Sequence, residues 1–171
     1  MKDDDTKENS TGSTARKPDA TKGPYLGEIG LENFAPYVMN RIMGRYNASL
    51  HEEMARLGLT TPKMRSLAVL AVLDGIQLRE LAVYTVVEQS TLSRAVEALT
   101  RDGLIRREPD PDDSRATRLY LTDAGRAAFD QLWPIMSKSY ERMFAGISED
   151  DRHAFVGTLK KMLTNVRQHD F

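Results

Sequence analysis

Apolar side chains recur every three or four positions along most of the chain, a spacing that predicts a largely helical protein. The first such stretch predicts a long amphipathic helix over about residues 32–57, ended by Gly58. A second predicted helix begins at Thr61 and stops at Asp74-Gly75. Each of these helices should bury its apolar face and leave the other face to solvent.

The C-terminal part of the chain predicts two further amphipathic helices. Thr122 can cap the first, which should reach toward Phe144 with a kink at Pro134, where one backbone hydrogen bond is missing. Ser148 followed by Asp151 resembles a capping box and should open the last helix. Together the two helices carry more apolar side chains than a small domain needs, which favours a dimer. The alternative is that they cover the core of the monomer.

The middle of the chain predicts a helix-turn-helix. Residues 76–82 fit its first helix and residues 84–87 its turn. Residues 89–101 fit the second helix, because they carry one apolar stripe opposite a face of small polar side chains. The stripe consists of Leu92, Val96 and Leu99. The polar first turns of such a helix are the part that meets base edges in the major groove of DNA.

A β-hairpin is predicted directly after that helix. Gly103 can end the helix in the left-handed conformation. Residues 104–108 and 116–121 are then β-compatible runs, joined by a loop over residues 109–114 that is rich in Pro and Asp. A helix-turn-helix followed by such a hairpin has the order of a winged helix, in which the hairpin is the wing.

Arginine side chains of the hairpin are suited to phosphates and guanine edges. Arg106 and Arg107 alternate across a strand, so one should face solvent or DNA while the other pairs locally. Arg115 lies at the predicted wing tip, where Asp113 should orient it by a charge-assisted bond. The alternative is that this pair only fastens the hairpin. The candidate DNA contacts are Gln89, Ser90, Thr91, Ser93, Arg94, Arg107, Asp113 and Arg115.

The charge of the chain limits how it can bind DNA. The net charge is −1, and residues 76–118 contain more carboxylates than basic side chains. The cations of this segment are all arginine, with no lysine between Lys63 and Lys138. Bulk attraction to DNA should therefore be weak, and binding should depend on individually placed contacts. The same balance leaves open an alternative function, a winged-helix module that binds a protein partner and not DNA.

From about residue 31 to 166 the chain resembles the MarR family of dimeric winged-helix transcriptional regulators. The resemblance is carried by Leu78-x-x-Leu81-Ala82, Ser90-Thr91-Leu92-Ser93-Arg94, Leu99-x-x-x-Gly103-Leu104-Ile105-x-Arg107, Asp113-x-Arg115 and Leu121-Thr122-x-x-Gly125. It implies a mainly α fold with a small β-wing, in which a winged helix-turn-helix DNA-binding domain is flanked by N- and C-terminal dimerisation helices. The winged helix would cover about residues 60–121, and the dimerisation helices about residues 31–57 and 122–168.

The same resemblance implies a homodimeric repressor that binds a palindromic operator in double-stranded DNA and responds to a small aromatic or phenolic effector. The effector would bind between the dimerisation helices and the winged domain, where methionines adapt to ligand shape and aromatic rings stack. The matching lining residues are Met39, Met43, Tyr46, His51, Met64, Phe129, Trp133, Met136 and Tyr140. The alternative is that these side chains form ordinary core.

Other function classes find little support in the sequence. Cysteine is absent, which excludes disulfides, thiolate metal sites and a nucleophilic cysteine. The histidines His51, His153 and His169 lack the spacing of a metal site. Nucleophile motifs and Gly-rich phosphate loops are also missing, so we expect neither an enzyme nor a cofactor.

The polar N-terminal segment differs in character from the rest of the chain. Residues 1–24 lack apolar periodicity and their charges cancel, so we expect a flexible arm, with a DNA- or partner-binding arm as the alternative. Residues 25–171 should form a single domain. No leader and no long apolar run are visible, so we expect a cytoplasmic protein.

Overall fold

The computed structural model describes residues 24–113 and 115–166, so the predicted flexible arm lies almost wholly outside the described residues. The chain divides into two compact units, Met1–Ile42 and Met43–Phe171. The first unit contains α1 (Leu26–Ile29), η1 (Leu31–Asn33) and the start of α2 (Ala35–Arg56). The long predicted helix is confirmed as α2, whereas α1 and η1 were not predicted because each is too short to show a period.

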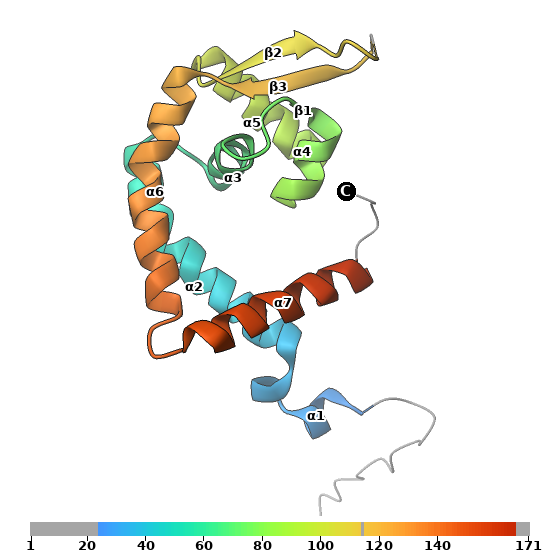
Figure 1. Ribbon diagram of the computed structural model, residues 1–171, viewed down its shortest axis with the longest axis vertical. Helices are drawn as coiled ribbons and strands as arrows, with labels where there is room; N and C mark the ends of the chain where they lie inside the picture. Colours follow the sequence, from blue (N-terminus) through green and yellow to red (C-terminus); the bar gives the residue numbers. More distant parts are fainter. Residues whose placement is uncertain (1–23, 114, 167–171) are drawn as a thin grey trace, which may run out of the picture. The chain divides into compact units, whose positions relative to one another are not determined.

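The second unit contains a winged helix followed by two long helices (Figure 1). Besides the rest of α2, its helices are α3 (Thr61–Leu70), α4 (Leu78–Thr85), α5 (Gln89–Arg101), α6 (Asp123–Met143) and α7 (Glu149–Val166). Its strands are β1 (Ile76–Gln77), β2 (Ile105–Pro109) and β3 (Thr117–Leu121). They form an antiparallel sheet in which β3 lies between β1 and β2. The described residues therefore confirm the predicted fold class.

The strand β1 corrects one prediction, because residues 76–77 were assigned to the first helix of the helix-turn-helix. Ile76 pairs with Leu119 and Gln77 with Arg118, and the N–H of Gly75 donates to the carbonyl of Leu119 at 2.9 Å. Two residues carry too little pattern to predict a strand, and their partner is distant in sequence. The strand attaches the start of α4 to the wing.

Two predicted boundaries also differ from the structure. The helix α3 ends at Leu70, before the predicted stop at Asp74, and Val72 beyond it is 80% exposed. The predicted turn over residues 84–87 included Tyr84 and Thr85, which instead belong to α4. The Thr85 side chain is buried, and its hydroxyl donates back to the carbonyl of Leu81 at 2.7 Å. The turn itself covers residues 86–88.

The core of the second unit consists of aliphatic side chains from nearly all of its elements. The predicted stripe on α5 is fully buried. The core residues are Leu50, Met54, Leu59, Met64, Leu67, Leu70, Leu81, Leu92, Val96, Leu99, Ile105, Leu119, Leu121 and Leu132. Burying each such side chain stabilises the fold by roughly 1.5–3 kcal/mol. This packing fixes the position of α5 against the wing and the neighbouring helices.

The helix α6 starts directly against the wing. The Thr122 hydroxyl accepts a hydrogen bond from the N–H of Gly125 at 3.0 Å, which confirms the predicted cap. The Thr122 N–H donates to the carbonyl of Leu104 at 3.1 Å. Gly125 lies so close to this carbonyl that a Cβ would come within 1.9 Å of its oxygen. The glycine is therefore required for the close approach of α6 to the start of β2.

The helices α6 and α7 meet at a tight elbow. The helix α6 continues through Pro134, so the missing backbone bond does not end it, and Ser148 caps α7 by accepting the N–H of Asp151 at 3.1 Å. Across the elbow, the ring of Phe144 lies 5.0 Å from that of Tyr140 and 6.1 Å from that of Phe155, measured between centroids. These aromatic contacts fix the direction in which α7 leaves α6.

The helix α7 buries none of its residues within the chain. Several of its apolar side chains are exposed, among them Phe155 at 42%, Leu163 at 65% and Val166 at 73%. A helix with such a face normally covers another surface. Across the described residues, no helix combines the length and the apolarity that crossing a membrane requires.

Candidate nucleic-acid interface

The first turns of α5 present the predicted polar side chains. Gln89, Ser90, Thr91 and Arg94 are exposed, while Ser93 is half-buried. Ser90 and Arg94 lie opposite the buried stripe of α5, which the core holds in place, and the other three lie beside the stripe. The structure therefore gathers these five candidates at one helix start, in the arrangement of a helix that enters a major groove.

The two arginines of β2 have different surroundings, as their alternation predicts. The Arg106 guanidinium lies over the Tyr120 ring, 4.3 Å from its centroid, and forms an ion pair with Glu108. Arg107 is exposed and has no ion pair among the described residues. Arg107 is thus the arginine of this strand that remains available to a partner, and Arg106 is engaged within the wing.

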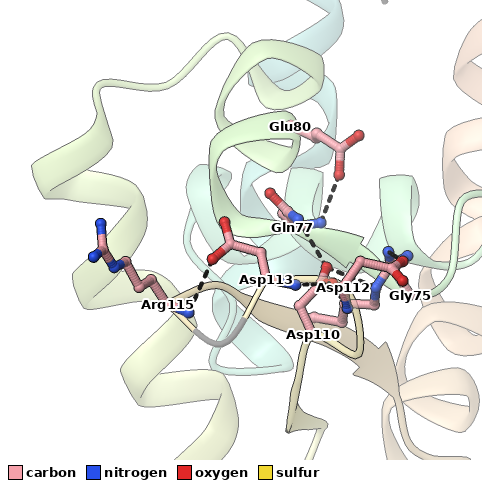
Figure 2. Close-up of polar contacts among 8 residues, drawn as sticks. Gly75, Gln77, Glu80, Asp110, Asp112, Asp113 and Arg115 are labelled. Atoms are coloured by element: carbon pink, nitrogen blue, oxygen red, sulfur yellow. Dashed lines mark hydrogen bonds and ion pairs between the residues drawn. The ribbon is translucent and has the colours of Figure 1, made fainter.

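The wing tip corrects the predicted role of Asp113. Its carboxylate accepts the backbone N–H of Arg115 at 3.0 Å, so it shapes the turn and does not pair with the guanidinium (Figure 2). In Figure 2 the Arg115 side chain points away from Asp113. In the described part of the chain Arg115 has no ion pair, which leaves its charge for a partner. Asp113 therefore fastens the hairpin turn, while Arg115 presents the cation.

A buried carboxylate that sequence analysis missed, Asp110, anchors the wing tip. It is 4% exposed and accepts hydrogen bonds from Gln77 Nε2 at 2.7 Å and from the N–H groups of Asp112 and Asp113 at 2.9 and 3.2 Å (Figure 2). The Gln77 bond, followed by the Asp112 N–H, lowers the pKa of Asp110 to about 2, and Arg118 adds to the effect. Asp110 is therefore charged at neutral pH and links the tip to β1.

Arg118 completes this anchor from β3. Its Nε lies 2.8 Å from Asp110 Oδ2, and its Nη1 donates to the carbonyl of Gly75 at 3.2 Å. The Nε–H does not point along the line to the carboxylate, so this contact is an ion pair and not a hydrogen bond. The Pro-Asp composition of the loop indicated a turn but did not indicate which carboxylate would turn inward.

A surface hollow of about 310 Å³ lies between the wing tip and the starts of α4 and α5. Its lining residues are Gln77, Leu78, Arg79, Gln89, Asp113, Arg115, Ala116 and Thr117. Two arginines from different elements therefore border one concave surface, and only Arg115 was predicted. Guanidinium groups in this arrangement can bind the phosphates of a nucleic-acid backbone.

The turn between α4 and α5 is built on a residue in the left-handed conformation. Val86 has φ 52° and ψ 50°, which for a β-branched residue costs on the order of 1–3 kcal/mol. The N–H groups of Val86 and Val87 donate back into the last turn of α4 at 3.3 and 3.4 Å, the pattern of a Schellman motif, in which glycine usually occupies this position. The carbonyl of Thr85 accepts a further hydrogen bond from Arg65 Nη1 at 3.0 Å.

A second, mainly apolar hollow of about 410 Å³ lies beside this turn. Its lining residues are Met43, Tyr46, Asn47, Met64, Arg65, Ala68, Val69, Tyr84, Thr85, Val86 and Met136. Four predicted effector residues are among them, Met43, Tyr46, Met64 and Met136. Burial raises the pKa of Tyr46, so its phenol stays protonated and can donate a hydrogen bond.

The other predicted effector residues do not line this hollow. His51 is exposed on α2, and the ring of Phe129 packs against that of Trp133 at 6.1 Å between centroids. Trp133 is 54% exposed, and Tyr140 belongs to the elbow between α6 and α7. Met39 belongs to the first unit.

Comparisons with known proteins agree on one family. A profile of the MarR family matches residues 57–116. The crystal structure of a MarR-family transcriptional regulator from Silicibacter pomeroyi shares 57% identity, with a TM-score of 0.83 over 86% of this chain and 100% of that one. The HTH-type transcriptional repressor IacR of Pseudomonas putida is 28% identical over 160 residues, which are 94% of this chain and 93% of IacR. BpsR of Bordetella bronchiseptica, whose DNA binding is regulated by 6-hydroxynicotinic acid, shares 25% identity and a TM-score of 0.65 over 75% of this chain and 97% of its own.

Proposed function

Because this chain belongs to the MarR family of DNA-binding transcriptional regulators, we propose that it is a homodimeric repressor that binds a palindromic operator and is released by a small aromatic effector. The observation that carries the proposal is the surface shared by α5 and the wing. The exposed start of α5 and the guanidinium of Arg115, which has no ion pair among the described residues, border one hollow together with Arg79. Such a surface can bind a major groove and the adjoining backbone at once.

The proposed contacts divide by chemistry. Gln89, Ser90, Thr91 and Ser93 offer short polar side chains for base edges, whereas Arg94 and Arg107 suit phosphates or guanine. Arg115 would reach the minor groove from the wing tip. Because the segment has no excess of positive charge, affinity would depend on these few contacts and specificity should be high relative to random DNA.

The proposed dimer would form through the terminal helices. The apolar face of α7 is left exposed or half-buried by the described residues, and a second copy related by a twofold axis would cover it. Two copies would place two α5 helices about one DNA turn apart, which is why the operator should be a palindrome. Such a repressor would act in the cytoplasm, where the DNA lies.

The effector site we propose is the apolar hollow beside the turn. Its size falls within the usual range of ligand sites, about 300–1,000 Å³. BpsR, a relative with the same fold, responds to an aromatic acid. The exposed Trp133 would report on ligands only indirectly, since it does not line the hollow.

Selection of bound sites from random DNA tests the central proposal. We expect an enriched palindrome, bound by a protein that sediments as a dimer, with an affinity that falls as salt rises. A protein that enriches no sequence, and that binds selected and random DNA equally weakly at low salt, would instead favour the winged-helix module that binds a protein partner.

A further inference from the structure

Arg65 belongs to two features at once, because it lines the apolar hollow and also holds the turn that precedes α5. Its Nη1 donates to the carbonyl of Thr85 at 3.0 Å, and both Thr85 and Val86 line the same hollow. Building on the proposed function, we propose that Arg65 is the residue through which an acidic ligand acts on the recognition helix. The carboxylate of the ligand would bind the guanidinium and thereby remove the hydrogen bond that holds the turn.

The surroundings of Arg65 leave its charge uncompensated. The other side chains that line the hollow are Met, Tyr, Asn, Ala, Val and Thr, none of them a carboxylate. No ion pair to Arg65 is found within residues 24–113 and 115–166. A guanidinium has five N–H donors, and a carboxylate can bind two of them side by side more strongly than a neutral carbonyl binds one. An acid whose carboxylate took the edge of the guanidinium that includes Nη1 would therefore compete effectively with the Thr85 carbonyl.

The Arg65 bond ties the turn to α3, whereas the bonds of the Val86 N–H, the Val87 N–H and the Thr85 hydroxyl run back into α4 itself. Val86 adopts a left-handed conformation that a β-branched residue disfavours, and its side chain is 81% exposed, so packing does not secure it. Only two residues, Val87 and Glu88, separate Val86 from the start of α5. If the turn relaxes, the first residues of α5 change direction, and these residues include the proposed base contacts. Loss of the Arg65 bond should therefore lower operator affinity.

The walls of the hollow indicate the body of the ligand. Met43, Met64 and Met136 supply adaptable apolar surface, and Tyr46 and Tyr84 supply rings. A small organic acid with a flat apolar body fits this combination. A neutral molecule of the same shape could occupy the hollow but would leave the bond between Arg65 and Thr85 in place. Charge, and not occupancy alone, would then determine the response.

The first test needs no ligand. Arg65→Gln should weaken binding to the selected operator by about tenfold, within the usual range of such couplings. It should also speed amide exchange at residues 86–88, while Arg65→Lys, which keeps a donor and a charge, should fall between it and the wild type. The matched control is Lys138→Gln, which removes an exposed cation from α6 and should change neither quantity. Circular dichroism melting shows whether each variant is folded.

A double variant separates a role in the turn from a general loss of stability. Glycine adopts the left-handed conformation without strain, so Val86→Gly in the Arg65→Gln background should recover most of the lost affinity. If Arg65→Gln binds the operator like the wild type and its amide exchange is unchanged, the proposal is overturned. The same holds if the double variant binds no better than Arg65→Gln.

The second test compares benzoate with benzamide, which share a shape but differ in charge. Benzoate at millimolar concentration should lower operator affinity and speed exchange at residues 86–88 in the wild type, whereas benzamide should do neither, and Arg65→Gln should not respond to either compound. Equal effects of the two compounds, or no effect of benzoate, would overturn the acid-release step. Amide exchange is measured without DNA, so it tests the role of Arg65 even if no operator is found. Failure to find an operator would count against the proposed function alone.

Discussion

Replacing Gly125 by alanine should destabilise the protein by roughly 3 kcal/mol, because the added methyl group has no space. Its Cβ would lie 1.9 Å from the carbonyl oxygen of Leu104 and 2.9 Å from Cδ1 of Leu121. A carbon and an oxygen in contact are normally about 3.3–3.6 Å apart. The start of α6 and the start of β2 would therefore have to separate by more than an ångström.

Neither the start of α6 nor the start of β2 can move without losing hydrogen bonds. The Leu104 N–H donates to the carbonyl of Leu99 at 2.9 Å, and the Leu104 carbonyl accepts the Thr122 N–H at 3.1 Å. Separation would break the bond to Thr122, which contributes about 0.5–1.5 kcal/mol, and disturb the cap on Gly125, which contributes about 1 kcal/mol. The remaining overpacking adds about 1–3 kcal/mol, so the three costs together reach about 2.5–5.5 kcal/mol. The helix preference of alanine offsets about 0.5–1 kcal/mol of this cost, and the expected value of roughly 3 kcal/mol lies within the resulting range.

Thermal and urea unfolding at a fixed protein concentration measure this effect. We expect the Gly125→Ala melting temperature to fall by about 6–12 °C, from a shift of about 2–4 °C per kcal/mol for a chain of this size. The matched control is Gly44→Ala on α2, where a Cβ meets nothing within 4 Å and alanine should stabilise the helix by about 0.5–1 kcal/mol. A Gly125→Ala protein as stable as the wild type would refute the reasoning, since it would show that α6 and β2 separate freely.

Three further predictions concern the candidate nucleic-acid interface. Arg115→Ala should weaken operator binding by about 1–3 kcal/mol and leave the melting temperature unchanged. Binding isotherms at several salt concentrations should show that the slope of log affinity against log salt concentration falls by about one unit. A lowered melting temperature with the same slope would contradict this prediction. Arg94→Ala should weaken operator binding in the same assays, and wild-type affinity for both operator and random DNA would show that α5 does not enter the groove. The pKa of Asp110 is lowered from 3.8 to about 2, so its contribution to wing stability should be complete above about pH 4 and be lost as the pH falls toward 2. Amide exchange of residues 112 and 113 should follow that titration, and Asp110→Asn should abolish it; a wing whose exchange is independent of pH over this range would count against the anchor.

The parts of the fold that could be predicted from the sequence are those with a local period. The helix α5 was placed at its observed boundaries because Leu92, Val96 and Leu99 form a stripe that the core buries completely. The caps of α6 and α7 were predicted because Thr122 and Ser148 act through neighbours three residues away.

The parts that could not be predicted depend on partners distant in sequence. The strand β1 exists because β3 offers it free backbone groups, and the two residues of β1 show no strand pattern of their own. Asp110 is one of three aspartates in the loop, and besides the N–H groups of Asp112 and Asp113, the distant residues Gln77 and Arg118 hold its carboxylate inward. The left-handed Val86 was also unpredictable, because glycine usually marks such a turn.

The arginine-only composition of the DNA surface has a practical consequence. No lysine lies between Lys63 and Lys138, and Lys63 is itself paired with Asp102 at 2.8 Å and only 15% exposed in its side chain. Guanidinium groups keep their charge at any pH at which the protein is folded, and lysine acetylation cannot neutralise them. The positive charge of the candidate nucleic-acid interface is therefore constant. Amine-reactive dyes should consequently label the protein on other surfaces and leave the winged helix free to bind its operator.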